Sequence, residues 1–173
     1  MRAIAAIAVI SALLATSAFA SDFRALDFGS PCAEAVELEE ALGAEPIPSQ
    51  SGPNQQTFRG RVFDHEATIL YLCPDGGFAL GHYAFVLQSF DKAFATFHDI
   101  YEVLNGMYGA PYIDNSRWQY DAASQDSRRV APDPAKYMVG WRDQRVSLSM
   151  HMAPTGTGTE WRVEVVFGRR KIY

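Results

Sequence analysis

Only two cysteines, Cys32 and Cys73, occur among the 173 residues, and they do not form a C-x-x-C pair. That absence removes the usual sequence signature of redox-active cysteines. The chain also lacks a G-x-S-x-G nucleophile motif, a Walker phosphate loop and a dinucleotide-binding fingerprint. The sequence therefore predicts no catalytic residue and no cofactor, and it favours a protein that is not an enzyme.

Metal-ligand spacing is missing as well, because no two of the four histidines stand in H-x-x-x-H or H-E-x-x-H. The nearest group, Asp64–Glu66, falls in an expected hairpin turn, where its side chains would point apart. Met150–Met152 has the composition of a soft copper site, but on a strand His151 points away from both methionines. We therefore predict no metal site, two core methionines, and a hydrogen-bonded core position for His82.

A long apolar run is found only at the N-terminus. Residues Ala3–Leu14 follow the basic Arg2, and small residues then lead to Ala18-Phe19-Ala20. This layout is typical of a secretory signal peptide with an A-x-A cleavage site, and the run is too short for a membrane span of about 20 residues. We expect a signal peptide over residues 1–20, a single domain over 21–173, no membrane span after cleavage, and a periplasmic or extracellular location.

Basic residues are scarce in the first part of the expected mature chain. Residues 21–114 hold 14 acidic and 4 basic residues, whereas residues 115–173 hold 6 acidic and 10 basic ones, and the whole chain has a net charge of −5. A negative balance argues against a nucleic-acid partner. The unevenness fits either two solvated faces of one domain or a dipolar surface that steers a charged protein partner.

The two cysteines leave two interpretations open. Cys32 stands near the start of an expected helix (Gly29–Gly43), where backbone N–H groups would stabilise a thiolate, so it could serve as a nucleophile or a peroxide sensor. An even cysteine count in an exported chain instead favours a disulfide between Cys32 and Cys73. Such a bond would stabilise the fold by about 3–4 kcal/mol in the chain-entropy model.

Apolar periodicity predicts a second, longer helix over Phe90–Tyr108, ended by Gly109 and Pro111. Alternating or apolar β-forming runs predict strands, and the Pro-, Ser- and Gln-rich segment Ala44–Gln56 reads as loop. The expected strands are Thr57–Phe63, Glu66–Cys73, Phe78–Gln88, a short one around Trp118 and Tyr120, Tyr137–Arg142, Arg145–Met152 and Glu160–Phe167. We therefore predict an α+β fold in which an antiparallel sheet of about six to seven strands packs against two helices in the order α-β-β-β-α-β-β-β.

Two segments, Leu26–Val36 and Phe90–Trp118, resemble parts of small exported bacterial envelope proteins built from a helix followed by three strands. The β-lactamase inhibitory protein and the SmpA/OmlA outer-membrane assembly lipoproteins contain such units, although this chain has no lipid-attachment cysteine. The resemblance implies a protein-binding module.

Candidate partner-binding residues are the arginines of two loops. Arg142 and Arg145 flank an expected tight turn at residues 143–144, and Arg128 and Arg129 lie in a long expected loop over 122–136. Long loops are often functional, so a basic rim for an acidic partner is the sharper interpretation, and ordinary solubilising charge is the other.

The sequence thus favours a non-catalytic protein-binding module of the cell envelope or the exterior, such as an inhibitor, an immunity factor or an assembly factor. An exported thiol enzyme or redox sensor that uses Cys32 is the first alternative. A carrier of an apolar small ligand, held between helix and sheet, is the second.

Overall fold

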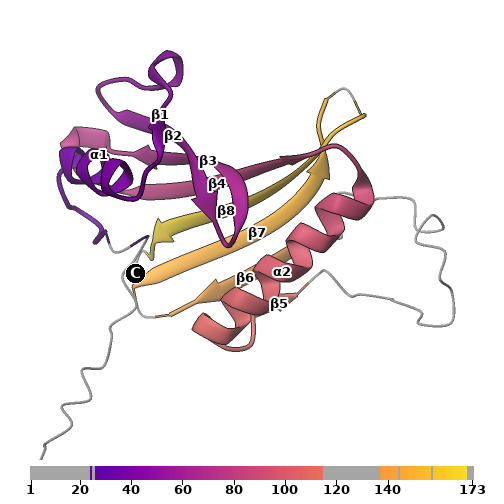
Figure 1. Cartoon of the computed structure of the whole chain (residues 1–173). Helices are drawn as coiled ribbons and strands as arrows, with labels where there is room; N and C mark the ends of the chain where they lie inside the picture. The colour runs from indigo at the N-terminus through magenta and orange to yellow at the C-terminus, as the bar shows by residue number, and fades with distance from the viewer. Residues whose placement is uncertain (1–23, 25, 115–136, 144, 157, 171–173) are drawn as a thin grey trace, which may run out of the picture.

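The computed structural model describes residues 24, 26–114, 137–143, 145–156 and 158–170. They form an antiparallel sheet of eight strands and two α-helices, α1 (Cys32–Ala41) and α2 (Phe90–Tyr108), as Figure 1 shows. Two short 3-10 turns, η1 (Pro48–Gln50) and η2 (Pro74–Gly76), lie in connections. The strands are β1 (Glu45–Pro46), β2 (Gln55–Val62), β3 (His65–Leu72), β4 (Leu80–Leu87), β5 (Ile113–Asp114), β6 (Met138–Arg142), β7 (Val146–Pro154) and β8 (Trp161–Arg169).

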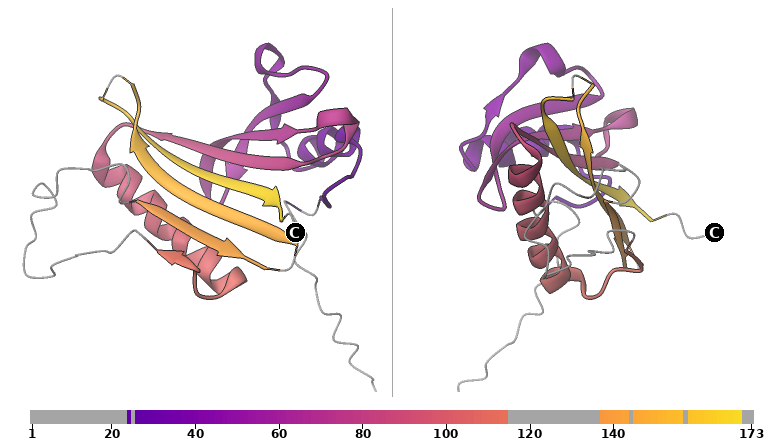
Figure 2. Two further views of the ribbon diagram at one scale, coloured as in Figure 1. Left: turned by 180° about the vertical axis from the view of Figure 1, so that it is seen from behind. Right: turned by 90° about the vertical axis from the view of Figure 1, so that its right-hand side faces the viewer.

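The sheet consists of two antiparallel meanders that meet at its centre. Its strand order is β1-β2-β3-β4-β8-β7-β6-β5, so the last strand of the chain pairs with β4. Helix α2 connects the two meanders and packs on the face of the sheet formed by β4, β8 and β7 (Figure 2). Strand β8 therefore lies at the centre of the sheet. Its eight residue pairs with β4, from Leu80↔Gly168 to Leu87↔Trp161, join the two meanders.

The predicted strand count and element order are wrong. The sheet has eight strands, and four strands follow each helix instead of three. One added strand, β1, lies in the segment expected to be loop and pairs through Glu45↔Arg59, and β5 follows α2 and pairs through Ile113↔Gly140. Two-residue strands are too short to show alternation of apolar and polar residues. They form by pairing with β2 and β6, and the local sequence does not indicate that pairing. The strand expected around Trp118 and Tyr120 lies outside the described residues.

The two helices begin differently. Ser89 caps α2 by accepting a hydrogen bond from the Lys92 backbone N–H at 3.3 Å, and Gly109, with φ of 76°, ends that helix as predicted. Helix α1 starts later than expected, at Cys32. Its N-cap residue is Pro31, and no side chain caps the helix. The Ser30 carbonyl instead accepts from the Phe78 backbone N–H at 2.8 Å, which ties the start of α1 to the segment after η2.

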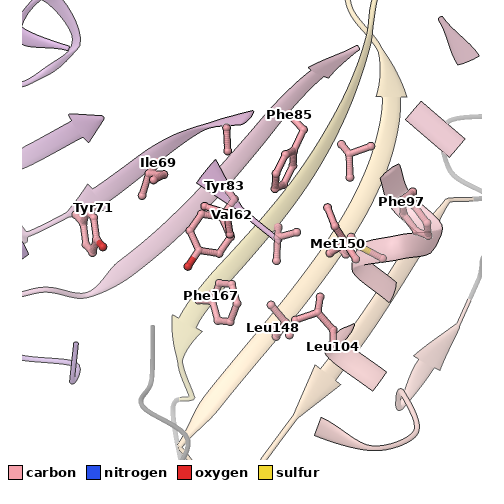
Figure 3. Close-up of a cluster of buried hydrophobic side chains, with 14 of the residues drawn as sticks. Val62, Ile69, Tyr71, Tyr83, Phe85, Phe97, Leu104, Leu148, Met150 and Phe167 are labelled. Atoms are coloured by element: carbon pink, nitrogen blue, oxygen red, sulfur yellow. The ribbon is translucent and has the colours of Figure 1, made fainter. Parts of the chain in front are cut away.

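The core lies on the face of the sheet that both helices cover. Alternation predicts the inward residues of β7 and β8 correctly, and all of them are buried (Figure 3): Val146, Leu148, Met150, Met152, Trp161, Val163, Val165 and Phe167. From α2, the fully buried Phe97, Ile100 and Leu104 pack against them. Burial of this apolar face is the main favourable term for folding.

The opposite face of the sheet, here called the open face, has no described helix on it. Strand β4 is central in the sheet, and only one of its faces packs against helices in the described part of the chain. Its outward residues are the half-buried His82 and Ala84 and the 48% exposed Val86. Continuous apolar character along β4 therefore reflects its neighbours β3 and β8 and not a second helical layer.

A buried polar network joins α1 to the sheet. The carboxylate of Glu39 is fully buried; it accepts a hydrogen bond from the Tyr71 hydroxyl and lies 2.9 Å from Nε of Arg24. Burial raises the pKa of Glu39, while Tyr71 and Arg24 oppose that rise. Helix α1 is thus positioned by one carboxylate that contacts both a β3 side chain and the N-terminal Arg24.

Replacing Glu39 by Ala should lower the free energy of unfolding by about 3 kcal/mol, because Arg24 and Tyr71 would lose their buried acceptor. Urea unfolding followed by circular dichroism measures this change. The matched variant Glu40→Ala, at an exposed position of the same helix, should change stability by less than about 0.5 kcal/mol. Equal losses in the two variants would contradict a special role for the Glu39 network.

Candidate functional site

The structure bonds Cys32 to Cys73 in a disulfide with a Cα–Cα distance of 5.9 Å. Cys32 is the first residue of α1, and Cys73 follows β3. The surrounding backbone is already paired, because Gly29 N–H donates to the Phe78 carbonyl at 2.8 Å and Pro31 bridges Gly77. The predicted pairing is confirmed, and the cysteine at the start of the helix is a covalent link and not a thiol.

The four histidines divide between the two faces of the sheet. His65 and His98 lie on the helix side, where His65 Nε2 is 3.5 Å from the Asp99 carboxylate and His98 Nε2 is 3.8 Å from Glu102. His65 begins β3, so it is not the turn residue that the sequence suggested; the turn is at residues 63–64. The other two histidines, His82 and His151, face the open side.

His151 and His82 meet at one carboxylate, that of Glu164. The Nε2 atom of His151 lies 2.5 Å from Glu164 Oε2, and that of His82 lies 3.5 Å from Oε1. Register explains this arrangement, because His151 is directly opposite Glu164 on β7 and Ala84 is opposite it on β4, two residues from His82. The prediction that His82 is a core residue is wrong, since its side chain is 24% exposed on the open face.

Glu164 is held in its charged form by these neighbours. The imidazole of His151, and after it that of His82, lowers the pKa of Glu164 well below its ordinary value, against an opposing effect of burial. Arg162 Nη1 adds a contact at 3.4 Å to Glu164 Oε1. Across the described residues, no group of three or more His, Cys, Asp and Glu side chains could hold a metal ion.

The other histidine-containing motif is arranged as predicted. Met150 and Met152 are fully buried on the helix side, and His151 between them faces the opposite way. The outward Ser147 and Ser149 occupy the same polar face of β7 as His151.

Four exposed arginines gather at one end of the sheet, around the turn between β6 and β7. Arg142 ends β6 and its guanidinium lies 4.4 Å from the centre of the Tyr112 ring, while Arg145 follows the turn. From the end of the chain, Arg170 N–H donates to the Arg145 carbonyl at 2.8 Å. We call this group the arginine cluster; its members are Arg142, Arg145, Arg169 and Arg170.

One acidic residue, Asp143, lies within the arginine cluster. Its Oδ1 accepts hydrogen bonds from the backbone N–H groups of Arg145 at 2.6 Å and Val146 at 2.7 Å, so it stabilises the turn. Its backbone carbonyl accepts from Arg170 Nη1 at 2.7 Å. Among the described residues, the cluster thus brings together four arginines and one aspartate, in a chain whose net charge is −5.

The structure places only half of the predicted partner-binding arginines together. Arg142 and Arg145 flank the turn between β6 and β7 as expected, whereas Arg128 and Arg129 are outside the described residues. Sequence reasoning missed Arg169 and Arg170, although the basic run at residues 169–171 could have indicated them. It also missed the meeting of His82 with Glu164, which depends on the long-range pairing of β4 with β8.

No protein-family model, curated protein or solved structure matches this chain. The resemblance to helix-plus-strand envelope proteins therefore stays a prediction. No described helix is long and apolar enough to cross a membrane, and the disulfide is compatible with an exported protein.

Replacing both cysteines by serine should lower the free energy of unfolding by about 3–4 kcal/mol. Without the bond, which joins residues 41 positions apart, the unfolded chain gains conformational entropy. Urea unfolding of the oxidised protein and of the double variant measures the loss. Intact-mass analysis after alkylation under denaturing, non-reducing conditions checks the bond itself. Any alkyl group added before reduction would contradict the pairing.

Replacing Glu164 by Gln should make stability less sensitive to acid. A carboxyl whose pKa is lowered by folding contributes stability that is fully present above its ordinary pKa of 4.5 and is lost as the pH falls. Urea unfolding from about pH 6 to pH 2.5 should therefore show a smaller decline in the variant than in the natural protein. The exposed Glu66 on the same face serves as control, and Glu66→Gln should leave the decline unchanged.

Proposed function

We propose that the protein is an exported, non-catalytic binding module whose arginine cluster contacts an acidic surface on another protein. The observation that carries this proposal is the convergence of four exposed arginines from three strand ends around a single turn. Asp143, the aspartate described within the cluster, accepts hydrogen bonds from backbone N–H groups of the turn. Carboxylates on an acidic partner would pair with the exposed guanidinium groups of the cluster.

Charge segregation gives this contact a direction. Helices α1 and α2 carry seven acidic residues and one lysine, and both pack on one face of the sheet. An acidic partner is therefore repelled by the helices and attracted by the arginine cluster at the end of the sheet, which orients it during diffusional encounter.

The strand edges favour a side-chain contact over strand addition. Both edge strands, β1 and β5, are two residues long. Such short edges offer few backbone groups for pairing with a partner strand. A partner would therefore be recognised through protruding arginines, a residue type that is frequent at binding hot spots.

The periplasm or the exterior is the proposed location, supported by the signal-peptide pattern of residues 1–20 and by a disulfide, which persists in oxidising compartments. An inhibitor, an immunity factor or an assembly factor of the envelope fits a small module that binds another protein. The bonded state of Cys32 does not favour the alternative of a thiol enzyme or redox sensor.

The alternative of an apolar-ligand carrier has little support from the packing. The interface between α2 and the sheet is filled by the protein's own side chains, and Phe97, Ile100 and Met150 there are fully buried. Protein side chains already occupy the space that an apolar ligand between helix and sheet would need.

A photo-cross-linking residue at Arg169, placed in the protein inside expressing cells, should capture a partner that the same residue at Glu102 on α2 does not. With that partner purified, charge reversal at Arg142 and Arg169 should slow association about tenfold at low salt and flatten its salt dependence. Reversal of the exposed Arg59, on β2 outside the cluster, is the matched control. Capture only from Glu102, or equal slowing by both changes, would refute the proposal.

A further inference from the structure

A depression of about 250 Å³ lies on the open face at the end of the β7–β8 hairpin. It is at the opposite end of these two strands from the arginine cluster, because the hairpin joins Pro154 to Trp161 while Val146 pairs with Arg169. Its volume is somewhat below that of typical drug-sized ligand sites, so it suits a small molecule. It is lined by His151, Ala153, Pro154, Thr155, Gly156, Arg162 and Glu164.

The polar groups of the depression contain more nitrogen donors than carboxylates. Glu164 is contacted by His151 at 2.5 Å, by Arg162 at 3.4 Å and, from beside the depression, by His82 at 3.5 Å. Arg162 is half exposed, so most of its donors can reach a molecule in the depression. The small residues Ala153 and Gly156 leave the space beside it open.

We infer that this depression binds a small organic acid, with Arg162 contacting its carboxylate. A guanidinium pairs with a carboxylate through two parallel hydrogen bonds, which gives geometric preference as well as energy. This site is separate from the arginine cluster, so the inference does not depend on the proposed function.

Glu164 is the acidic residue that lines the depression, and its carboxylate is already contacted by His151 and Arg162. The carboxylate of Glu160, close to the hairpin, accepts a hydrogen bond from Gln88 Nε2 at 3.3 Å.

The test uses tartrate, a small dicarboxylic acid. Titration of the ¹⁵N-labelled full mature protein, followed by amide chemical shifts, should perturb residues 151–156 and 162–164. Absence of shifts in these segments would overturn the inference.

Variants separate this site from general attraction of anions. Arg162→Gln should weaken tartrate binding roughly tenfold, whereas Arg59→Gln, elsewhere on the sheet, should not. The charge-reversed Arg142 and Arg169 variant should bind tartrate normally. Equal weakening by Arg59→Gln, or loss of binding in the charge-reversed variant, would overturn the inference.

Discussion

The alternation of apolar and polar side chains along β7 and β8 is the constraint on which the rest of this structure depends. Because successive side chains point to opposite faces, the apolar residues of both strands fall on one side, and their burial requires a helix on that side. Helix α2 meets that requirement, since its apolar stripe packs on β8, β7 and the neighbouring β4. The same alternation leaves His151, Arg162 and Glu164 on the open face, so the packing that builds the core also assembles the polar row opposite it.

Helix α1 is attached to the N-terminal meander by specific links, whereas α2 is attached to the sheet by apolar packing. Helix α1 has two buried residues, Ala35 and Glu39, so it buries far less apolar surface than α2 does. The disulfide at its start and the Glu39 carboxylate near its end attach it to β3 at two points, Cys73 and Tyr71. A short helix with a weak apolar face can keep a fixed position when a covalent bond and a buried polar contact replace part of the missing burial.

Local sequence signals predicted the elements that carry strong periodicity and failed where pairing is long-range. The bounds of α2 and the inward residues of β7 and β8 follow from spacing alone, and the Cys32–Cys73 bond follows from an even cysteine count in a chain that is expected to be exported. The strands β1 and β5 are too short for a periodic pattern, and their existence depends on partners such as Arg59 and Gly140. The same limit applies to the candidate sites: Arg142 and Arg145 are neighbours in sequence, whereas the addition of Arg170 and the meeting of His82 with Glu164 need the position of β8.

Strand β8 is where these features come together. It is the strand of the second meander that pairs with the first, and it contributes four buried residues to the core. It also ends in the arginine cluster and carries Arg162 and Glu164 on its outward face. Its outward positions alternate with the residues that anchor it, so the rigid core fixes the places of the charged groups. A strand of nine residues spans about 30 Å, which keeps the cluster and the depression several Debye lengths apart at physiological salt. An anion at one end would thus exert little direct field on the other, and any coupling between the two sites would have to pass through the strand and its packing.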